Sequence, residues 1–259
     1  VRRRGDVQTS GAVVSAAQQP APPTGRRPES VGAAQPTAEQ NQGFGNAVSK
    51  IEAQAQRLGV NVQARSDMTR DAQYNYETQT IEYDPARLAN RGQDGAKAAM
   101  REELIHATMH KVLMTRTKGK NPRQAFETFF GSVGKSLTQE QRTALEAVYG
   151  EQLDDTGTGA EYTRFLVQQA LDGKTTESFM RTGPAFNKVK SLIKSVQAYA
   201  TRIFGKDLEQ NQEAAFVIAD TIKVLRNLDP DARPAQQKIV EQALSIVSGS
   251  QALSSENIS

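Results

Sequence analysis

Strand-like patterns occur in one short stretch of this chain, residues 60–84, and every other periodic segment is helical. Residues 60–64 (VNVQA) alternate apolar and polar side chains as a half-buried strand does. Residues 72–76 and 80–83 flank a polar turn and predict a β-hairpin that closes at Asp84. Because so few residues have strand character, the sequence predicts an α+β fold in which one small sheet lies beside helices.

The rest of the ordered chain is predicted to consist of amphipathic helices. Apolar side chains recur at steps of three and four, and Gly59 and Gly183 mark places where helices stop or start. Thr138 and Gln141 have the spacing of a capping box. Residues 154–159, which include two glycines, are expected to form a loop. Helices are expected over about 44–58, 96–113, 122–130, 138–148, 160–172, 186–203, 208–227 and 234–248.

Composition divides the chain into four parts. Residues 1–42 hold half of the ten prolines among Ala, Gln, Ser and Thr, and they lack helical or strand periodicity, which predicts a flexible linker. An ordered α+β domain is expected over 43–175, and a helical region over 184–250. Residues 251–259 are expected to be a disordered tail.

Composition also argues against several classes of protein. The absence of cysteine removes disulfides and thiolate metal sites, and a net charge of +3 is too small to predict nucleic-acid binding. No apolar run in the sequence reaches the roughly 18 residues of a membrane span. The basic start has no apolar stretch behind it, so no signal peptide is expected. The chain begins with Val1 rather than Met, which suggests a fragment or a cleaved product.

The sequence contains two histidines, His106 and His110, which are four residues apart in the predicted helix 96–113. That spacing puts both imidazoles on one face of a helix, one turn apart, where they can hold a single metal ion. A catalytic zinc site takes a third protein ligand, which here has to be Asp or Glu. Glu161, at the start of a predicted helix, is favoured for this role. The alternatives are Glu151, Asp154 and Asp155.

The histidine pair also has an interpretation without metal. It can be a solvated helix face, with Leu104, Ile105 and Met109 turned towards the core. The absence of any other histidine and the preceding hairpin favour the metal site.

With a sheet, a hairpin, a helix carrying His106-x-x-x-His110 and a later helical Glu161, the chain resembles the zincin metallopeptidases of the gluzincin type. It is similar in particular to the compact metallopeptidase domains embedded in large multi-domain proteins of phages and mobile elements. The resemblance covers about residues 44–172. It implies a zincin-like domain followed by a helical region, with zinc held by both histidines and by Glu161.

In the zincin motif His-Glu-x-x-His, the glutamate activates water and passes its proton to the leaving amine. The resemblance places that glutamate at Ala107, where a methyl group can do neither. Three explanations are open: an engineered Glu-to-Ala change, a natural pseudoenzyme, or a base supplied from elsewhere. Glu103 is the candidate for that base, because it lies about 60° around the helix axis from His106. Glu102 or Glu103 could instead accept a hydrogen bond from a histidine ring.

The expected function is therefore zinc-dependent peptide-bond hydrolysis, inactive as it stands if Ala107 replaces the base. The substrate would be a protein or peptide, with the chain itself as one candidate. A di-iron site built on Glu103 and His106 is disfavoured, because no second Glu-x-x-His exists in the sequence. The rival function is a non-enzymatic helical module of a larger assembly, such as a phage virion. The chain is expected to be soluble, and cytoplasmic or virion-associated.

Overall fold

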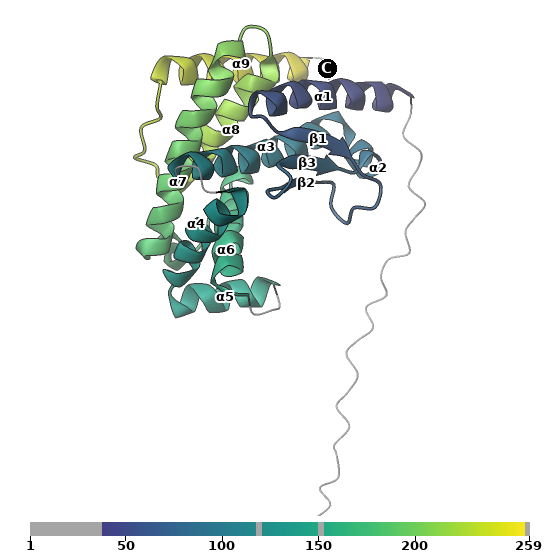
Figure 1. The fold of residues 1–259 in the computed structure, drawn as a ribbon. Helices are drawn as coiled ribbons and strands as arrows, with labels where there is room; N and C mark the ends of the chain where they lie inside the picture. The colour runs from purple at the N-terminus through teal and green to yellow at the C-terminus, as the bar shows by residue number, and fades with distance from the viewer. Residues whose placement is uncertain (1–37, 118–120, 150–152, 257–259) are drawn as a thin grey trace, which may run out of the picture. The chain divides into compact units, whose positions relative to one another are not determined.

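The computed structural model describes residues 38–117, 121–149 and 153–256. Its secondary structure confirms the α+β class, with α-helices around one small sheet (Figure 1). Most of the predicted linker, residues 1–37, lies outside the described residues. Residues 36–259 form one compact unit, so the predicted helical region and the predicted α+β domain belong to the same unit.

The sheet is built from the three segments that the sequence marked as strands. Strand β1 (Asn61–Ala64) pairs in parallel with β3 (Thr80–Tyr83), and β2 (Ala72–Asn75) pairs antiparallel with the other side of β3. The strand order is β1-β3-β2, so β2 lies at an edge. Asp84 does not only end the hairpin. Its side chain accepts hydrogen bonds from the backbone N–H groups of Ala86 and Arg87 and so caps a short helix that the sequence pattern had not indicated.

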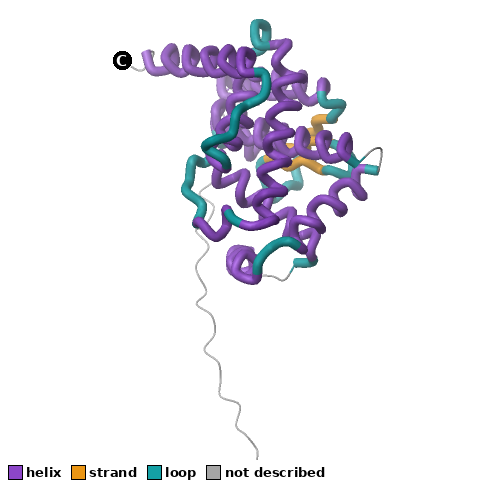
Figure 2. Tube along the Cα trace, turned by 90° about the vertical axis from the view of Figure 1, so that its left-hand side faces the viewer, coloured by secondary structure: helices purple, strands orange, loops and turns teal. Residues whose placement is uncertain are grey.

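The helices follow the predicted series, with longer ends. Helix α3 packs against α1, β2, β3, α4, α7 and α8, which places it at the centre of the fold. Figure 2 shows the strands enclosed among the helices. The helices are α1 (Ala38–Arg57), α2 (Pro85–Asn90), α3 (Gly92–Arg116), α4 (Pro122–Lys135), α5 (Gln139–Tyr149), α6 (Asp155–Leu171), α7 (Gly183–Phe204), α8 (Gln212–Leu228) and α9 (Gln237–Glu256), with short 3-10 turns at Ser178–Arg181 and Gly205–Asp207.

Several helices extend beyond the ranges that the sequence predicted. Helix α1 begins at Ala38, inside the range 1–42 assigned to the linker, because the polar residues there continue a helix whose apolar positions come later. Helix α9 continues to Glu256, through most of the range 251–259 that was predicted to be a disordered tail. The capping box at α5 is confirmed, since Thr138 and Gln141 exchange hydrogen bonds between their side chains and backbone N–H groups.

The predicted loop over 154–159 is also wrong, because α6 begins at Asp155 and Asp154 caps it. The glycines of this region serve helix packing instead. A Cβ added at Gly134 of α4 would lie 1.8 Å from the carbonyl oxygen of Asp155, and one at Gly159 would lie 2.0 Å from that of Phe130. Helices α4 and α6 can therefore approach this closely only because both positions lack a side chain.

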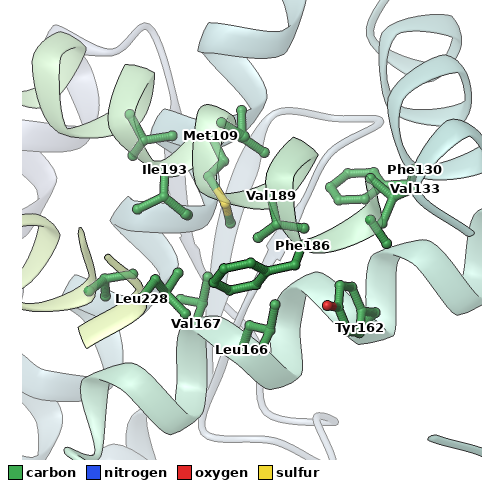
Figure 3. Packing of buried hydrophobic residues seen from close by; sticks show 14 of the residues in the cluster. Met109, Phe130, Val133, Tyr162, Leu166, Val167, Phe186, Val189, Ile193 and Leu228 are labelled. Carbon is green, nitrogen blue, oxygen red and sulfur yellow. The ribbon is translucent and has the colours of Figure 1, made fainter. Parts of the chain in front are cut away.

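Buried apolar side chains form two clusters that share α3. The bundle-side cluster joins α3 to helices α4, α6, α7 and α8, and Figure 3 shows Phe186 at its centre, with Met109 and Tyr162 nearby. The sheet-side cluster joins α3 to α1, the sheet, α8 and α9. Helix α3 is therefore covered by apolar side chains on two sides. Its side chains that face neither cluster are available to form a functional site. Among the described residues, no helix is long and apolar enough to cross a membrane.

Candidate functional site

A cavity of about 750 Å³ opens along the face of α3 that the two core clusters leave uncovered. We call it the α3 pocket. Glu102, Glu103, His106 and His110 line one wall. The opposite wall is formed by residues 69–76, which include edge strand β2, and the rim is completed by side chains from α2, α4 and α6. The structure thus brings both histidines and both glutamates of the predicted motif into one cavity.

Glu103 is held against the edge of the sheet. Its Oε2 accepts a hydrogen bond of 2.6 Å from the backbone N–H of Tyr74 in β2. Burial raises the pKa of the Glu103 carboxyl, and the neighbouring carboxylate of Glu102 raises it further, while His106 and Arg70 act in the opposite direction. A raised pKa makes this carboxylate a stronger base than an exposed glutamate, which favours a role in proton transfer.

His106 lies between the two glutamates. Its Nε2 is 4.0 Å from Oε1 of Glu102, one helical turn earlier, and 20% of its side chain is exposed to solvent. Burial by itself would lower the pKa of His106, but the carboxylates of Glu102 and Glu103 outweigh that effect and raise the pKa. The imidazolium form of His106 is therefore stabilised relative to that of an ordinary histidine.

His110 is more enclosed than His106, with 3% of the residue exposed. Its Nε2 lies 3.4 Å from the carbonyl oxygen of Pro122, and its Nδ1 lies 2.7 Å from the hydroxyl oxygen of Tyr74. A carbonyl can only accept, so Nε2 donates to Pro122 and the Tyr74 hydroxyl donates to Nδ1. Burial lowers the pKa of His110, which favours the same neutral form.

Ala107 faces away from the α3 pocket. It is completely buried and belongs to the sheet-side cluster, together with Met100 and Leu104 on the same side of α3. A side chain at position 107 is therefore directed into apolar core, whereas the side chain of Glu103 is directed into the cavity. The expectation that Ala107 occupies the place of a catalytic base remains a prediction, and its burial favours the alternative base, Glu103.

The carboxylates predicted as third zinc ligand are engaged elsewhere. Glu161 accepts a hydrogen bond of 2.7 Å from Nε of Arg164, a residue that lines the α3 pocket, and Glu161 itself does not line it. Asp154 caps α6, and Asp155 pairs with Arg142 at 2.6 Å. Glu151 lies outside the described residues. Within residues 38–117, 121–149 and 153–256, no three His, Asp or Glu side chains are grouped so that they could hold one metal ion.

Several residues of the site were missed by reasoning from the sequence. Tyr74 and Tyr76 were assigned only to a strand, although their spacing of two already predicts that they share one face of the sheet. Tyr76 stacks on Phe126 with a centroid separation of 4.2 Å and meets the edge of His110 at 6.3 Å. The arginines of the pocket rim come from separate parts of the sequence, and no local pattern brings them together.

Comparisons with known proteins give no information on the function, so the function has to be argued from the geometry of the site. No match was found among models of known protein families, among curated proteins or among solved structures.

Proposed function

We propose that the chain is a zinc-dependent peptidase of the zincin type that uses Glu103 as its general base. The observation that carries this proposal is the position of Glu103. Its carboxyl lies in the α3 pocket beside His106, is held by the Tyr74 N–H at 2.6 Å, and has a raised pKa. A buried, positioned carboxyl next to imidazoles in a cavity is the arrangement that general acid–base hydrolysis needs.

The geometry favours one of two possible alignments of the motif. In a zincin helix, two ligands lie one turn apart, and the base follows the first ligand directly. If the ligands are His106 and His110, the base position is Ala107, which points into the core. If the ligands are Glu102 and His106, the base position is Glu103, which points into the α3 pocket. The second alignment places both ligands and base at the same opening.

The donor set of the pocket suits zinc in its chemistry, because zinc binds imidazole nitrogen and carboxylate oxygen. Glu102 and His106 would supply an oxygen and a nitrogen. His110 lies eight residues from Glu102, about 12 Å along the helix axis, so these two cannot share one ion. Among the described residues no third His, Asp or Glu is grouped with Glu102 and His106, so a third donor has to move in from another element. Glu161 of α6 is the candidate, and it would have to give up its present bond to Arg164. A bound zinc ion would polarise the substrate carbonyl and lower the pKa of water.

In this proposal Glu103 moves the proton. It removes a proton from the water whose oxygen attacks the peptide carbonyl carbon, and it delivers that proton to the leaving amine nitrogen when the C–N bond breaks. Its hydrogen bond to the backbone N–H of Tyr74 keeps the carboxylate in place in the wall of the cavity. The Tyr74 hydroxyl, which now donates to His110, is a neutral donor in the wall of the pocket that could stabilise a negative charge on the substrate oxygen.

The proposal is tested by loading the purified chain with Zn²⁺ and removing unbound metal by gel filtration. Bound zinc is then measured by mass spectrometry, and hydrolysis of a mixture of unstructured peptides is followed by the release of new amino groups. About one zinc per chain is expected. Glu103→Gln should keep the zinc and lose about 10²–10⁴-fold in hydrolysis. His106→Ala and Glu102→Ala should lose zinc, and Glu140→Gln, at an exposed glutamate of α5, should change neither quantity.

Each part of the proposal has its own contrary outcome. Zinc that stays bound after His106→Ala would exclude the assigned metal site. Hydrolysis that survives Glu103→Gln would exclude Glu103 as the base. A chain that retains no zinc and cleaves no peptide would leave the non-enzymatic helical module as the better interpretation.

A further inference from the structure

The α3 pocket has two chemically different ends, and the contacts along α3 show their order. Arg91, which directly precedes α3, forms an ion pair with Asp71 at the start of the opposite wall. Further along, Glu103 contacts Tyr74, and beyond it His110 contacts Tyr76. The wall formed by residues 69–76 and helix α3 therefore run in the same direction past the cavity, with Glu103 between the two ends.

The end near the start of α3 is cationic. Arg70, Arg87 and Arg91 line it, and about half of each paired side chain is exposed, 48% for Arg87 and 54% for Arg91. Arg87 and Arg91 each pair with a carboxylate, at Asp84 and Asp71, and the exposed part of each guanidinium group remains accessible to a ligand. In the described part of the chain Arg70 has no ion pair within 4.0 Å, and its charge acts on Glu103.

The other end of the pocket is apolar. Tyr76 and Phe126 stack there with an interplanar angle of 6°, and Phe130 lies against Phe126 at 4.5 Å between ring centroids. Met109 and Leu113 of α3 complete this end. Phe130, Met109 and Leu113 are buried, whereas Tyr76 and Phe126 are half-buried. The part of these two rings that faces the opening can take a large apolar side chain, because contact with it removes their apolar surface from water.

From these two ends we propose that the α3 pocket selects an extended peptide segment with an acidic side chain on one side of the cleaved bond and a bulky apolar side chain on the other. The acidic side chain would lie between Arg70 and Arg87, and the apolar one against Phe126. This substrate class rests on the proposed peptidase function, because it takes Glu103 as the position of the cleaved bond.

The length of the pocket sets the spacing of the two side chains. From Asp71 to Tyr76 the wall spans five residue steps, or about 16 Å at 3.3 Å per residue of extended chain. A bound peptide in extended conformation would cover the same distance with about five residues. The acidic and apolar side chains should therefore be three to five residues apart, with the cleaved bond between them.

The test combines cleavage and binding. The zinc-loaded chain is incubated with a diverse peptide mixture, and the residues around each cut are read by mass spectrometry. For the best peptide, kcat/KM is compared with that of the same peptide carrying Gln in place of its Glu. We expect the acidic peptide to be preferred about threefold to thirtyfold at low salt, and less at 0.5 M salt. The double variant Arg70→Gln/Arg87→Gln should lose this preference. Arg226→Gln, at an exposed position of α8, should keep it.

Binding separates failure of this inference from failure of the proposed function. Fluorescence anisotropy measures the affinity of Glu103→Gln for labelled eight-residue peptides that carry Glu and Phe four residues apart, and for their Gln and Ser counterparts. Cleavage without any acidic or apolar preference would overturn the substrate class and leave the peptidase function in place. Binding that requires Arg70 and Arg87, with no cleavage by the zinc-loaded chain, would support the ligand class and overturn the peptidase function. No selective binding and no cleavage would overturn both.

Discussion

Replacing Ala107 by glutamate should unfold the protein more readily and should not create activity. Position 107 is fully buried in the sheet-side cluster, so the new carboxylate would be enclosed by apolar side chains such as Met100 and Leu104. Glutamates buried in this way have a pKa of about 8–9 instead of about 4.3. At pH 7 the carboxyl would be kept neutral at a cost of about 4 kcal/mol, since one pKa unit corresponds to about 1.4 kcal/mol.

The added volume increases this cost. Extra methylene groups in a packed core destabilise by about 1–3 kcal/mol, which brings the expected loss for Ala107→Glu to about 5–7 kcal/mol. Domains are typically stable by about 5–15 kcal/mol, so the variant should be close to unfolding or unfolded at 37 °C. If position 107 instead faced substrate, the same change would restore the base of a zincin motif and would cost little stability.

Ala107→Gln is the matched control, because it adds nearly the same volume without an ionisable group. In Ala107→Glu the pKa of the carboxyl is raised in the folded state, so the folded chain binds more protons than the unfolded chain. The difference between the two variants should therefore be small at pH 4 and should grow as the pH rises to 7. Denaturant unfolding followed by circular dichroism at both pH values measures it. Ala107→Glu that is as stable as Ala107→Gln at pH 7 and cleaves peptides would refute the reasoning.

Three further predictions concern the site and the packing around it. Glu103→Gln should raise the free energy of unfolding at pH 7, because burial raises the pKa of Glu103 and the charged carboxylate is therefore disfavoured in the folded chain. The gain should disappear below pH 4, and a lower stability at pH 7 would contradict this. Tyr74→Phe should cost about 1 kcal/mol, since it removes the hydrogen bond to His110 while keeping the ring, and an unchanged unfolding curve would exclude that bond. Gly134→Ala should lower the free energy of unfolding by at least about 2 kcal/mol, because the new methyl group would collide with α6. Gly45→Ala, in open space on α1, is the control and should raise the free energy of unfolding by up to about 1 kcal/mol. Equal effects of the two changes would contradict the close approach of α4 and α6.

The sheet and most helices could be predicted because their signals are local. The strand-like segments 72–75 and 80–83 are separated by a polar turn, and the apolar steps of three and four in α3 and α7 match the residues that these helices bury. The start of α6 could not be predicted in the same way. Glycine lowers helix propensity, so Gly157 and Gly159 indicated a loop, but Gly159 is needed where α4 crosses α6. That requirement comes from a helix distant in the sequence.

The candidate site was predictable only in part, for a related reason. The spacing of Glu103, His106 and His110 predicts that they share one face of a helix, and all three line the α3 pocket. The residues that influence the protonation of these side chains are distant in the sequence. Tyr74 of β2 is hydrogen-bonded to Glu103 and to His110, and Arg164 of the pocket belongs to α6. Their roles depend on tertiary contacts that no motif in the sequence records.

The alignment of the motif depends on how α3 is covered. At 100° per residue, Glu102, Glu103, His106 and His110 fall within a sector of about 100° around the helix axis, whereas Ala107 lies within about 20° of Met100. In an amphipathic helix with one apolar stripe, the sequence itself shows which sector of the helix faces away from the core. Helix α3 contributes to two clusters, so apolar residues flank the histidines on both sides and the sequence does not show that sector. The sector that lines the α3 pocket is therefore visible only after both clusters have formed. Because Glu103 lies inside that sector and position 107 lies outside it, the base of a hydrolytic site on α3 has to be sought at Glu103.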